Sequence, residues 1–333
     1  MADRPIATVV ILTYNGEVYL REILRYLRKQ EVDGSMEILV IDSGSTDSTL
    51  DIIRDFPEVR LHEIPNEEFG HGRTRNLAAQ LANGEFVAYL THDAVPADER
   101  WLAELLAPFA IDERVVAVMG NQKPRPDAPP IVKFEILRVF SQFGPALGTT
   151  VYSAGDFATD EAAMGFISFY SDVNSAARRS VLIDRIPYRD VRYAEDQMFG
   201  RDVVDAGLWK AYAPRAVVVH SNDLTFLEFG KRIFDETVAL REIGTEVPHR
   251  SLFARLARAG YGAIRDAPTI LRDAEYSWKR KVYWTIVNPV YHFRKWSAYD
   301  RASRVDLEDR AAISGGSLEH ERKTDTGGPG AAR

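Results

Sequence analysis

Residues 85–94 read Glu85-Phe-Val-Ala-Tyr-Leu-Thr-His-Asp-Ala94, and this stretch is the strongest indication of the fold class. Its apolar run, Phe86 to Leu90, has turn residues on both sides, which is typical of a short buried strand. The strand ends near a carboxylate, Asp93, at the sheet edge where open α/β sheets bind ligands. A carboxylate there suits a hard cation, and a hard cation suits a diphosphate. Taken alone, Asp93 is more simply explained as a cap of the turn or helix that follows.

Length and composition are those of a folded protein. With 333 residues, 45% hydrophobic and 27% charged, the chain can bury a sizeable core. Its net charge of −7 argues against nucleic-acid binding, which needs a basic surface. The absence of cysteine excludes disulfides, thiolate metal sites and cysteine nucleophiles, and it agrees with a cytoplasmic location. No secretory signal pattern opens the chain, and no apolar run approaches the length of a bilayer crossing.

Strands and helices alternate through the first half of the chain. Apolar runs predict strands at residues 7–13, 37–41, 59–64, 86–90 and 115–120, and helical spacing predicts helices at 18–30, 48–56, 73–81 and 98–109. This alternation predicts an α/β fold with a single doubly wound, mostly parallel sheet. The turn after the first strand, Thr13-Tyr14-Asn15-Gly16, matches neither the dinucleotide fingerprint nor the P-loop.

Polar side chains follow the second strand and open the third helix. Asp42 stands at a strand end, where its carboxylate can accept hydrogen bonds from a base or a sugar, whereas Ser45, Thr46 and Asp47 are good helix caps. Arg73 and Arg75 lie in the first turn of a helix, where the helix dipole disfavours cations. A bound diphosphate is therefore a reasonable partner, and a surface salt bridge is the alternative, above all for Arg73.

Two further positions combine ionisable residues with element ends. Glu195 and Asp196 precede a helical pattern, which is explained either by an N-terminal charge cluster or by a general base at the mouth of a site. Adjacent residues point in different directions, so we expect only one of the pair to face a substrate. His220 ends the apolar strand 216–219 and is explained equally well as a metal ligand or as a structural histidine.

Together these segments resemble the family-2 nucleotide-sugar glycosyltransferases over residues 6–245. The resemblance rests on motifs that occur in family order: Val9–Asn15, Ile41–Asp47, Thr74–Asn76, Thr91–Asp93 and Glu195–Asp196. It implies the nucleotide-diphospho-sugar transferase fold (GT-A) and an inverting, metal-assisted hexosyltransferase that uses Mg²⁺ or Mn²⁺. A retaining route would need a nucleophilic carboxylate on the opposite face of the sugar, and the sequence shows no clear second candidate for it.

The resemblance also implies a role for individual positions. It implies Asp196 as the catalytic base, and Asp93 and His220 as metal ligands. The nucleotide would contact Thr13, Tyr14, Asn15, Asp42, Arg75 and His92, and the donor sugar or the acceptor would lie near Asn174 and Glu195. Thr91 departs from the family pattern, because it replaces the first acid of the Asp-x-Asp metal motif. Threonine is a poorer cation ligand than a carboxylate, so we expect a weaker dependence on metal.

Finer details are similar to bacterial rhamnosyltransferases. They are Asp42-Ser43-Gly44, Phe69–Asn76, Thr91–Ala94 and Ser171–Arg179. This similarity implies dTDP-L-rhamnose as donor and a glycan or lipid-linked glycan as acceptor, in cell-surface polysaccharide synthesis. A UDP- or GDP-sugar donor is the alternative. A nucleotidyltransferase would need a glycine- and base-rich loop after the first strand, and a non-catalytic sugar-nucleotide binder would need neither Asp93 nor Asp196.

The C-terminal third differs in composition from the rest. We expect a catalytic domain at 1–245, a helical aromatic and basic extension at 246–310, and a disordered tail at 311–333. Aromatic residues alternate with lysine and arginine over 276–299, where Pro289 is expected to separate two helices. Such helices suit peripheral contact with the inner face of the plasma membrane, and packing on the catalytic domain is the alternative.

Overall fold

The computed structural model describes residues 4–155, 159–242 and 244–324, and the chain forms two compact units. Unit 1 comprises Met1–Lys123 and Leu137–His220, and unit 2 comprises Pro124–Ile136 and Ser221–Arg333. The predicted boundary at residue 245 therefore differs from the observed division at His220. The reason is that the helix after His220 buries Phe229 and Phe234 among other apolar side chains of unit 2.

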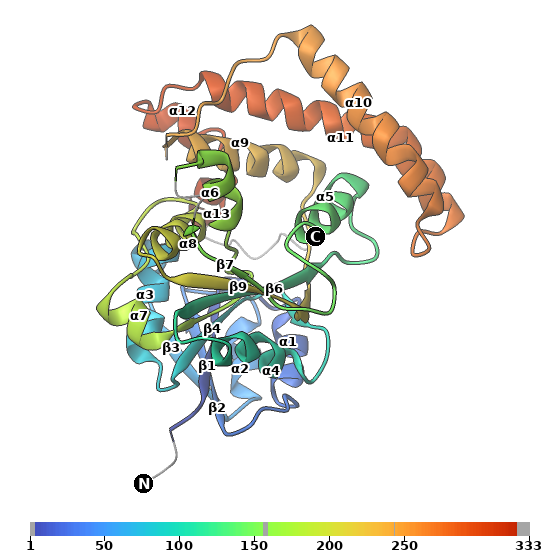
Figure 1. The fold of residues 1–333 in the computed structure, drawn as a ribbon. Coiled ribbons are helices and arrows are strands. Elements are labelled where there is room, and N and C mark those ends of the chain that lie inside the picture. Colours follow the sequence, from blue (N-terminus) through green and yellow to red (C-terminus); the bar gives the residue numbers. More distant parts are fainter. Residues whose placement is uncertain (1–3, 156–158, 243, 325–333) are drawn as a thin grey trace. The chain divides into compact units, whose positions relative to one another are not determined.

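Unit 1 is built on one mixed sheet with the strand order β3-β2-β1-β4-β8-β6-β9-β5, and β7 pairs with β9 (Figure 1). Its first four strands are parallel: β1 (Ala7–Thr13), β2 (Met36–Asp42), β3 (Val59–Glu63) and β4 (Phe86–Thr91). A second parallel pair is formed by β6 (Val115–Lys123) and β9 (Trp209–Val219). Between β4 and β6, β8 (Asn174–Arg178) runs antiparallel to both of these neighbours. The short strands β5 (Val95–Pro96) and β7 (Thr150–Tyr152) run antiparallel to β9.

The α/β fold with a mostly parallel sheet is confirmed, and besides the short strands β5 and β7 the sequence pattern missed β8. Its sequence, Asn-Ser-Ala-Ala-Arg, has none of the β-branched or aromatic residues that favour strands. Ala176 and Ala177 are nevertheless completely buried, because β8 lies in the middle of the sheet.

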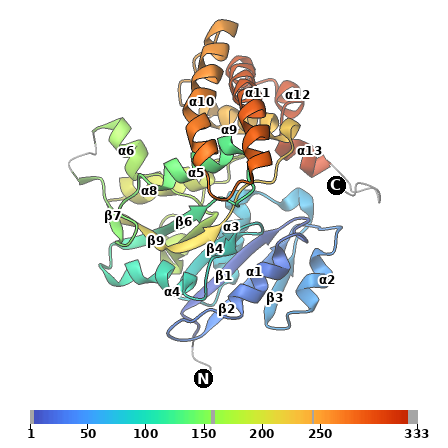
Figure 2. The ribbon, with the colours of Figure 1, turned by 90° about the vertical axis from the view of Figure 1, so that its right-hand side faces the viewer.

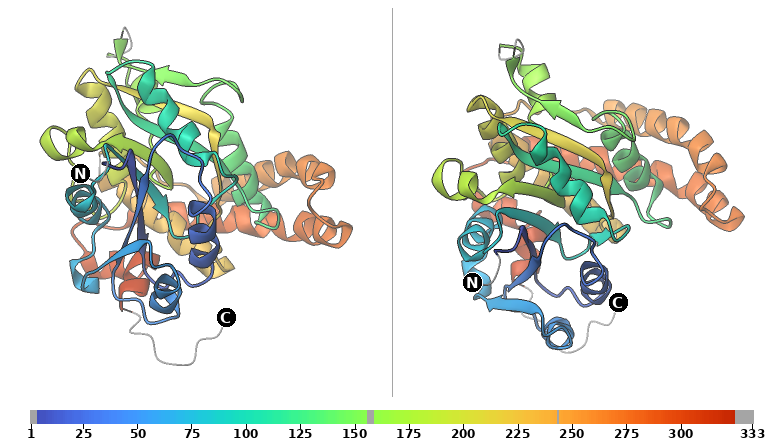
Figure 3. Two further views of the ribbon diagram at one scale, coloured as in Figure 1. Left: turned by 90° about the horizontal axis from the view of Figure 1, so that it is seen from below. Right: turned by 60° about the horizontal axis from the view of Figure 1, so that its bottom comes forward.

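The helices of unit 1 cover both faces of this sheet. One face carries α1 (Leu20–Leu27), α2 (Thr49–Arg54) and α4 (Trp101–Leu106) (Figures 2 and 3). Their apolar side chains pack with Val9, Ile11, Ala88 and Leu90 in one core. Because side chains alternate along a strand, Tyr89 points to the other face, where its hydroxyl reaches α3 (His71–Leu81). Two further helices there are α7 (Arg179–Asp184) and α8 (Glu195–Asp205), and α6 (Glu161–Ile167) contacts α8.

Unit 2 is helical. Its helices are α9 (Phe226–Glu242), α10 (Leu252–Arg272), α11 (Trp278–Arg304), α12 (Arg310–Ser314), α13 (Leu318–Thr324) and the first part of α5 (Pro130–Phe140). A short turn brings α11 back along α10, so the two form a hairpin (Figure 1). Tyr276, Trp284 and Tyr291 pack with Phe229 in the core of this unit. Within the described part of the chain, no helix combines the length and the apolar character that a membrane crossing requires.

Two predictions for the C-terminal third are wrong. Pro289 lies inside α11 and does not divide it, since Trp284, Asn288 and Tyr291 are buried on both sides of the proline and hold the helix in place. The expected disordered tail contains α12 and α13, with Ile313 and Leu318 buried. Asp235 accepts hydrogen bonds from the backbone N–H groups of Leu318 and Glu319, at 2.8 and 3.2 Å, which anchors α13. Residues 325–333 of the expected tail lie outside the described residues.

Candidate functional site

The carboxyl ends of β1, β2 and β4 meet at one edge of the sheet of unit 1. In the strand register Thr13 lies opposite Asp42, and Leu12 lies opposite Thr91. Thr13 and Asp42 therefore lie at the same edge of the sheet as the end of β4, which His92 and Asp93 follow, as the sequence predicted. Ligands of open α/β sheets bind at this kind of edge.

The loops after β1 and β2 are fastened to each other by hydrogen bonds. The Asn15 backbone N–H donates to Ser45 Oγ, and the Thr46 N–H donates to Asn15 Oδ1, both at 2.8 Å. Asn15 adopts φ +50°, a left-handed conformation that asparagine tolerates better than most residues. The half-buried Tyr14 lies in the same loop, and Gly16 packs against His92, since a Cβ at Gly16 would lie 3.4 Å from the His92 Cβ.

Asp42 is completely buried and uses both carboxylate oxygens within this framework. Its Oδ1 accepts from Thr13 Oγ1 at 2.9 Å and from Ser45 Oγ at 2.5 Å. Its Oδ2 accepts from the backbone N–H groups of Gly44 and Ser45, at 3.0 and 2.9 Å. A carboxylate offers about four acceptor sites, so a base could bond Asp42 only by displacing one of these donors.

Asp93 and His220 lie together beyond the ends of β4 and β9. The distance from His220 Nε2 to Asp93 Oδ2 is 3.4 Å. Burial alone would raise the pKa of Asp93, but the attraction and hydrogen bond of His220 hold that pKa well below its usual range. On the other side of the ring, His220 Nδ1 lies 3.1 Å from Gln122 Oε1. An amide oxygen can only accept, so Nδ1 is the donor to Gln122, and Nε2 is the ring nitrogen on the side of Asp93.

These residues fit a divalent cation that the protein holds only in part, with the remaining ligands supplied by a bound diphosphate and water. Asp93 Oδ2 and His220 Nε2, two atoms that can ligate a cation, lie 3.4 Å apart, and the buried Thr91 Oγ1 belongs to the residue two positions before Asp93. Among the described residues, no group of three His, Cys, Asp or Glu side chains is placed to hold a metal. A cation here would need further oxygen ligands, such as diphosphate and water.

A second cluster surrounds Arg75, on the face of the sheet that carries α3 and α8. Arg75 Nε lies 3.0 Å from Asp172 Oδ2, and Arg75 Nη1 pairs with Glu195. The guanidinium also lies 5.9 Å and 5.7 Å from the ring centres of Tyr89 and Tyr188. We predicted that Arg75 binds the diphosphate of the donor. In the structure its guanidinium instead forms ion pairs with the buried carboxylates of Asp172 and Glu195.

Asp172 is the site residue that sequence reasoning missed. It is buried and accepts hydrogen bonds from Ser175 Oγ at 2.6 Å and from the Tyr188 hydroxyl at 2.9 Å. It lies within the segment 171–179 that resembles rhamnosyltransferases, but no strand pattern marked its neighbourhood. A buried charge needs a partner, and only the fold brings Arg75 to it.

Asp196 and Glu195 are neighbours in sequence with different environments. Glu195 is buried against Arg75, whose attraction outweighs the effect of burial and lowers the pKa of Glu195. For Asp196, burial and repulsion by Glu195 and Asp172 raise the pKa to about 8. Its carboxylate accepts from the Gln197 N–H at 2.8 Å and from the Asp172 N–H at 3.4 Å. Titratable groups whose pKa values are driven apart are typical of acid–base sites, and Glu195 and Asp196 form such a pair.

A chain of contacts connects the two clusters. Gln122, which bonds His220, donates through Nε2 to Ser171 Oγ at 3.0 Å. Ser171 is followed by Asp172, which contacts both Arg75 and Asp196. The strand-end histidine and the candidate base therefore share one hydrogen-bonded framework.

Asn174 and Glu195 do not fit their predicted contact with donor sugar or acceptor. The Asn174 side chain is completely buried, donating to the carbonyls of Asn121 and Ala216 and accepting from Trp101 Nε1. These bonds hold β8 in the sheet and leave the Asn174 side chain no exposed surface for a ligand. Glu195 is likewise occupied by Arg75.

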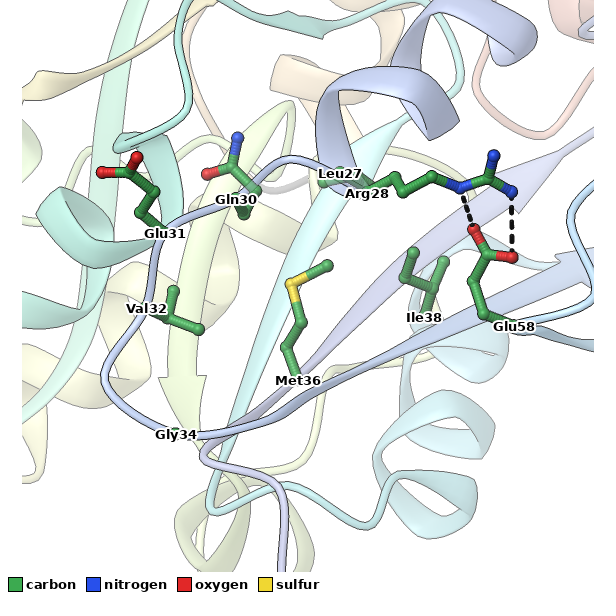
Figure 4. Close-up of a pocket in the computed structure, with 9 residues that line it drawn as sticks. All are labelled: Leu27, Arg28, Gln30, Glu31, Val32, Gly34, Met36, Ile38 and Glu58. Carbon is green, nitrogen blue, oxygen red and sulfur yellow. Dashed lines mark hydrogen bonds and ion pairs between the residues drawn. The ribbon is translucent and has the colours of Figure 1, made fainter.

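A pocket of about 440 Å³ lies at the opposite ends of the strands (Figure 4). Its lining includes Val32, Met36 and Ile38 around the start of β2, and the Arg28–Glu58 ion pair stands beside it, with N–O distances of 2.7 and 3.0 Å. It contains none of the candidate site residues. Since ligands of such sheets bind at the carboxyl ends of the strands, this pocket is not the candidate active site.

Two O-antigen chain rhamnosyltransferases resemble this chain over more than two thirds of its length. The O-antigen chain rhamnosyltransferase RfbN of Salmonella typhimurium strain LT2 is 32% identical over 235 residues, which cover 69% of this chain and 71% of that protein. The O-antigen chain rhamnosyltransferase WbaN of Salmonella anatum is 32% identical over 239 residues, covering 70% and 72%.

The solved structures that resemble this chain include two transferases. One is the mannosyltransferase PcManGT from Pyrobaculum calidifontis in complex with GDP-Man and Mn²⁺, with a TM-score of 0.56 and 20% identity over 91% of this chain and 89% of that one. The other is residues 1–349 of TarS from S. aureus in complex with UDP-GlcNAc, with a TM-score of 0.52 and 18% identity over 93% and 79%. At these identities the likeness concerns the fold, and it confirms the GT-A type.

The family assignment rests on the sequence itself. Residues 8–185 match the model of glycosyl transferase family 2, and they carry the β1, β2 and β4 strand ends that form the site. The chain belongs to glycosyl transferase family 2.

Proposed function

We propose that this enzyme transfers L-rhamnose from dTDP-L-rhamnose, with inversion, to a hydroxyl of a glycan or lipid-linked glycan in cell-surface polysaccharide synthesis. The observation that carries the proposal is Asp196, a carboxylate whose pKa is raised to about 8 and which is linked to the Asp93–His220 pair. The choice of donor is supported by the 32% identity to the two O-antigen rhamnosyltransferases. A UDP- or GDP-sugar donor is the alternative.

In this mechanism Asp196 accepts the proton of the acceptor hydroxyl as its oxygen attacks the anomeric carbon. The bond from that carbon to the diphosphate breaks, and its electron pair leaves with the diphosphate. A base with a raised pKa holds the proton more firmly than an ordinary aspartate does, which favours the transfer. Direct displacement inverts the anomeric configuration. A retaining route would need a nucleophilic carboxylate, and Asp172 and Glu195 are both paired with Arg75.

Asp93 and His220 would hold a divalent cation together with the donor diphosphate. A bound Mg²⁺ or Mn²⁺ would neutralise the charge that develops on the leaving diphosphate. Arg75 would support the proton transfer indirectly, because its ion pairs hold Asp172 and Glu195 beside Asp196.

Thermal stabilisation by nucleotide sugars tests the proposed donor. A ligand that binds only the folded state at 100 times its Kd stabilises it by about 2.7 kcal/mol. We expect dTDP-L-rhamnose with Mn²⁺ to raise the Tm, and UDP-GlcNAc and GDP-mannose to raise it less. A larger rise with a UDP- or GDP-sugar would reject the rhamnose donor and keep the mechanism. If no donor raises the Tm, with or without an acceptor glycan, the transferase proposal fails.

Gln122→Leu tests the role of His220 in holding the cation. The substitution removes the acceptor that orients the ring, and loss of such a supporting contact costs about 10- to 100-fold in metal affinity. We expect weaker Mn²⁺ binding in the presence of dTDP, measured by the electron paramagnetic resonance signal of free Mn²⁺. Gln142→Leu is the matched control, because Gln142 is exposed and, within the described part of the chain, its side chain donates one hydrogen bond, to the Arg138 carbonyl. Equal Mn²⁺ affinity in both variants would reject this role.

A further inference from the structure

An exposed apolar stripe runs along α10 of unit 2. Phe253 and Ile264 are 82% and 76% exposed, and Leu271 is exposed as well. They belong to one helical row that repeats every three or four residues and contains no charge: Phe253, Ala257, Gly260, Ile264, Pro268 and Leu271. We call this row the α10 stripe. On the opposite side of the helix, Ala259, Gly262, Asp266 and Ile270 are buried, so the stripe is a second apolar face and not part of the core.

The first half of α11 carries a similar exposed row. Trp278 and Ile286 are 70% and 69% exposed, and they are separated by steps of four residues in the row Trp278, Val282, Ile286 and Val290. Other aromatic residues of the expected membrane segment 276–299 are turned inward: Tyr276, Trp284 and Tyr291 are buried in unit 2. The exposed apolar surface therefore lies on α10 and the first half of α11, and several aromatic side chains of 276–299 do not contribute to it because they are buried.

The charge around these rows is basic, although the whole chain has a net charge of −7. Arg258, Arg265 and Arg272 repeat every seven residues along α10, so they form a row beside the stripe. Lys279 and Lys281 add further positive charge at the start of α11, whereas Arg280 pairs with Asp127 at 3.6 Å.

The acidic residues of segment 252–290 have partners inside unit 2. Asp266 is buried and bonds His292 Nε2 at 2.8 Å, and Lys133 pairs with Asp273 and Glu275 at 2.8 and 2.6 Å. The outward charge of the hairpin is therefore predominantly positive.

We propose that the α10–α11 hairpin binds the surface of a lipid bilayer that contains anionic lipids. An apolar stripe about 30 Å long with flanking arginines matches a helix that lies in the membrane interface, with rings among the acyl chains and bases on the headgroups. A second copy of this chain would present the same positive row and repel it. The proposal does not depend on the transferase activity, because it rests on unit 2 alone.

Sedimentation with vesicles tests the proposal on the full-length protein. We expect binding to vesicles of phosphatidylcholine and phosphatidylglycerol, little binding to phosphatidylcholine alone, and weaker binding at high salt. Phe253→Ser with Ile264→Ser should abolish binding, and Arg272→Gln should weaken it about fivefold. Leu147→Ser is the matched control, since Leu147 is an equally exposed apolar residue of unit 1.

The same variants distinguish a lipid bilayer from a second copy of the chain as the partner of the apolar surface of the hairpin. Circular dichroism should show unchanged helix content, because the substituted side chains are exposed. The proposal is overturned if wild-type protein ignores the anionic vesicles, or if the serine variant binds them as well as the wild type does. It is also overturned if sedimentation velocity shows a dimer that the serine substitutions dissociate, since the face would then join two copies.

Discussion

Asp196→Asn is expected to lower the rate of sugar transfer about a thousandfold while leaving donor affinity nearly unchanged. Asparagine keeps the shape of the side chain but cannot accept the proton of the acceptor hydroxyl, and a positioned general base contributes about 10²- to 10⁴-fold. The measurements are the single-turnover rate and the Kd for the donor. A loss that appears only in the rate identifies an interaction made in the transition state.

Asp205→Asn is the matched control for this substitution. Asp205 is the last residue of α8, the helix whose second residue is Asp196, but it is exposed and pairs with Arg201 at the surface. We expect transfer by this variant to equal that of the wild type. Full activity in Asp196→Asn would show that another group takes the proton.

The pH dependence of transfer gives a second readout of the same role. Burial and the neighbouring carboxylates raise the pKa of Asp196 to about 8, so the base is protonated and inactive in most molecules at neutral pH. The rate should therefore rise with pH and level off above about 8. The residual rate of Asp196→Asn should lack this rise. A wild-type rate that is flat from pH 6 to 9 would contradict the assignment, provided that chemistry limits the rate.

Arg75→Met is expected to lower the free energy of unfolding by about 3–5 kcal/mol, the cost of removing one partner from a buried ion pair. Without the guanidinium, Asp172, Glu195 and Asp196 are left close together without their shared cation. These carboxyl groups should then take up protons in the folded state. Because protonation relieves the repulsion, the loss of stability should be smaller at pH 5 than at pH 8. Urea denaturation at the two pH values measures both effects.

Arg73→Met is the control from the same turn of α3. Arg73 is half-exposed and lies 3.9 Å from Asp190, so its loss should cost no more than about 1 kcal/mol. The comparison also separates the two interpretations of Arg75. If Arg75 served mainly to bind the donor diphosphate, its loss would weaken donor binding and leave the free energy of unfolding nearly unchanged.

The local pattern of the sequence located the strands that carry the site and the residues at their ends. An apolar run that stops at a polar residue needs only neighbouring positions to be recognised, as at β2 with Asp42 and β4 with Asp93. The same reasoning failed at β8, because small residues such as Ala176 and Ala177 become strand residues only between β4 and β6. It failed again at Pro289, where packing on both sides preserves the helix.

By itself, the sequence determined the α/β class, the family motifs and the order of the strand-end residues, since each depends on residues close together in the chain. Tertiary structure alone decided that Arg75 pairs with Glu195, 120 positions away, and that Asp172 joins them. It also decided that Trp284 is buried while Trp278 is exposed, although both lie in the same aromatic and basic segment. Burial and the sharing of charge are set by contacts between distant residues, and these contacts determine the pKa of Asp196 and the surface of α10.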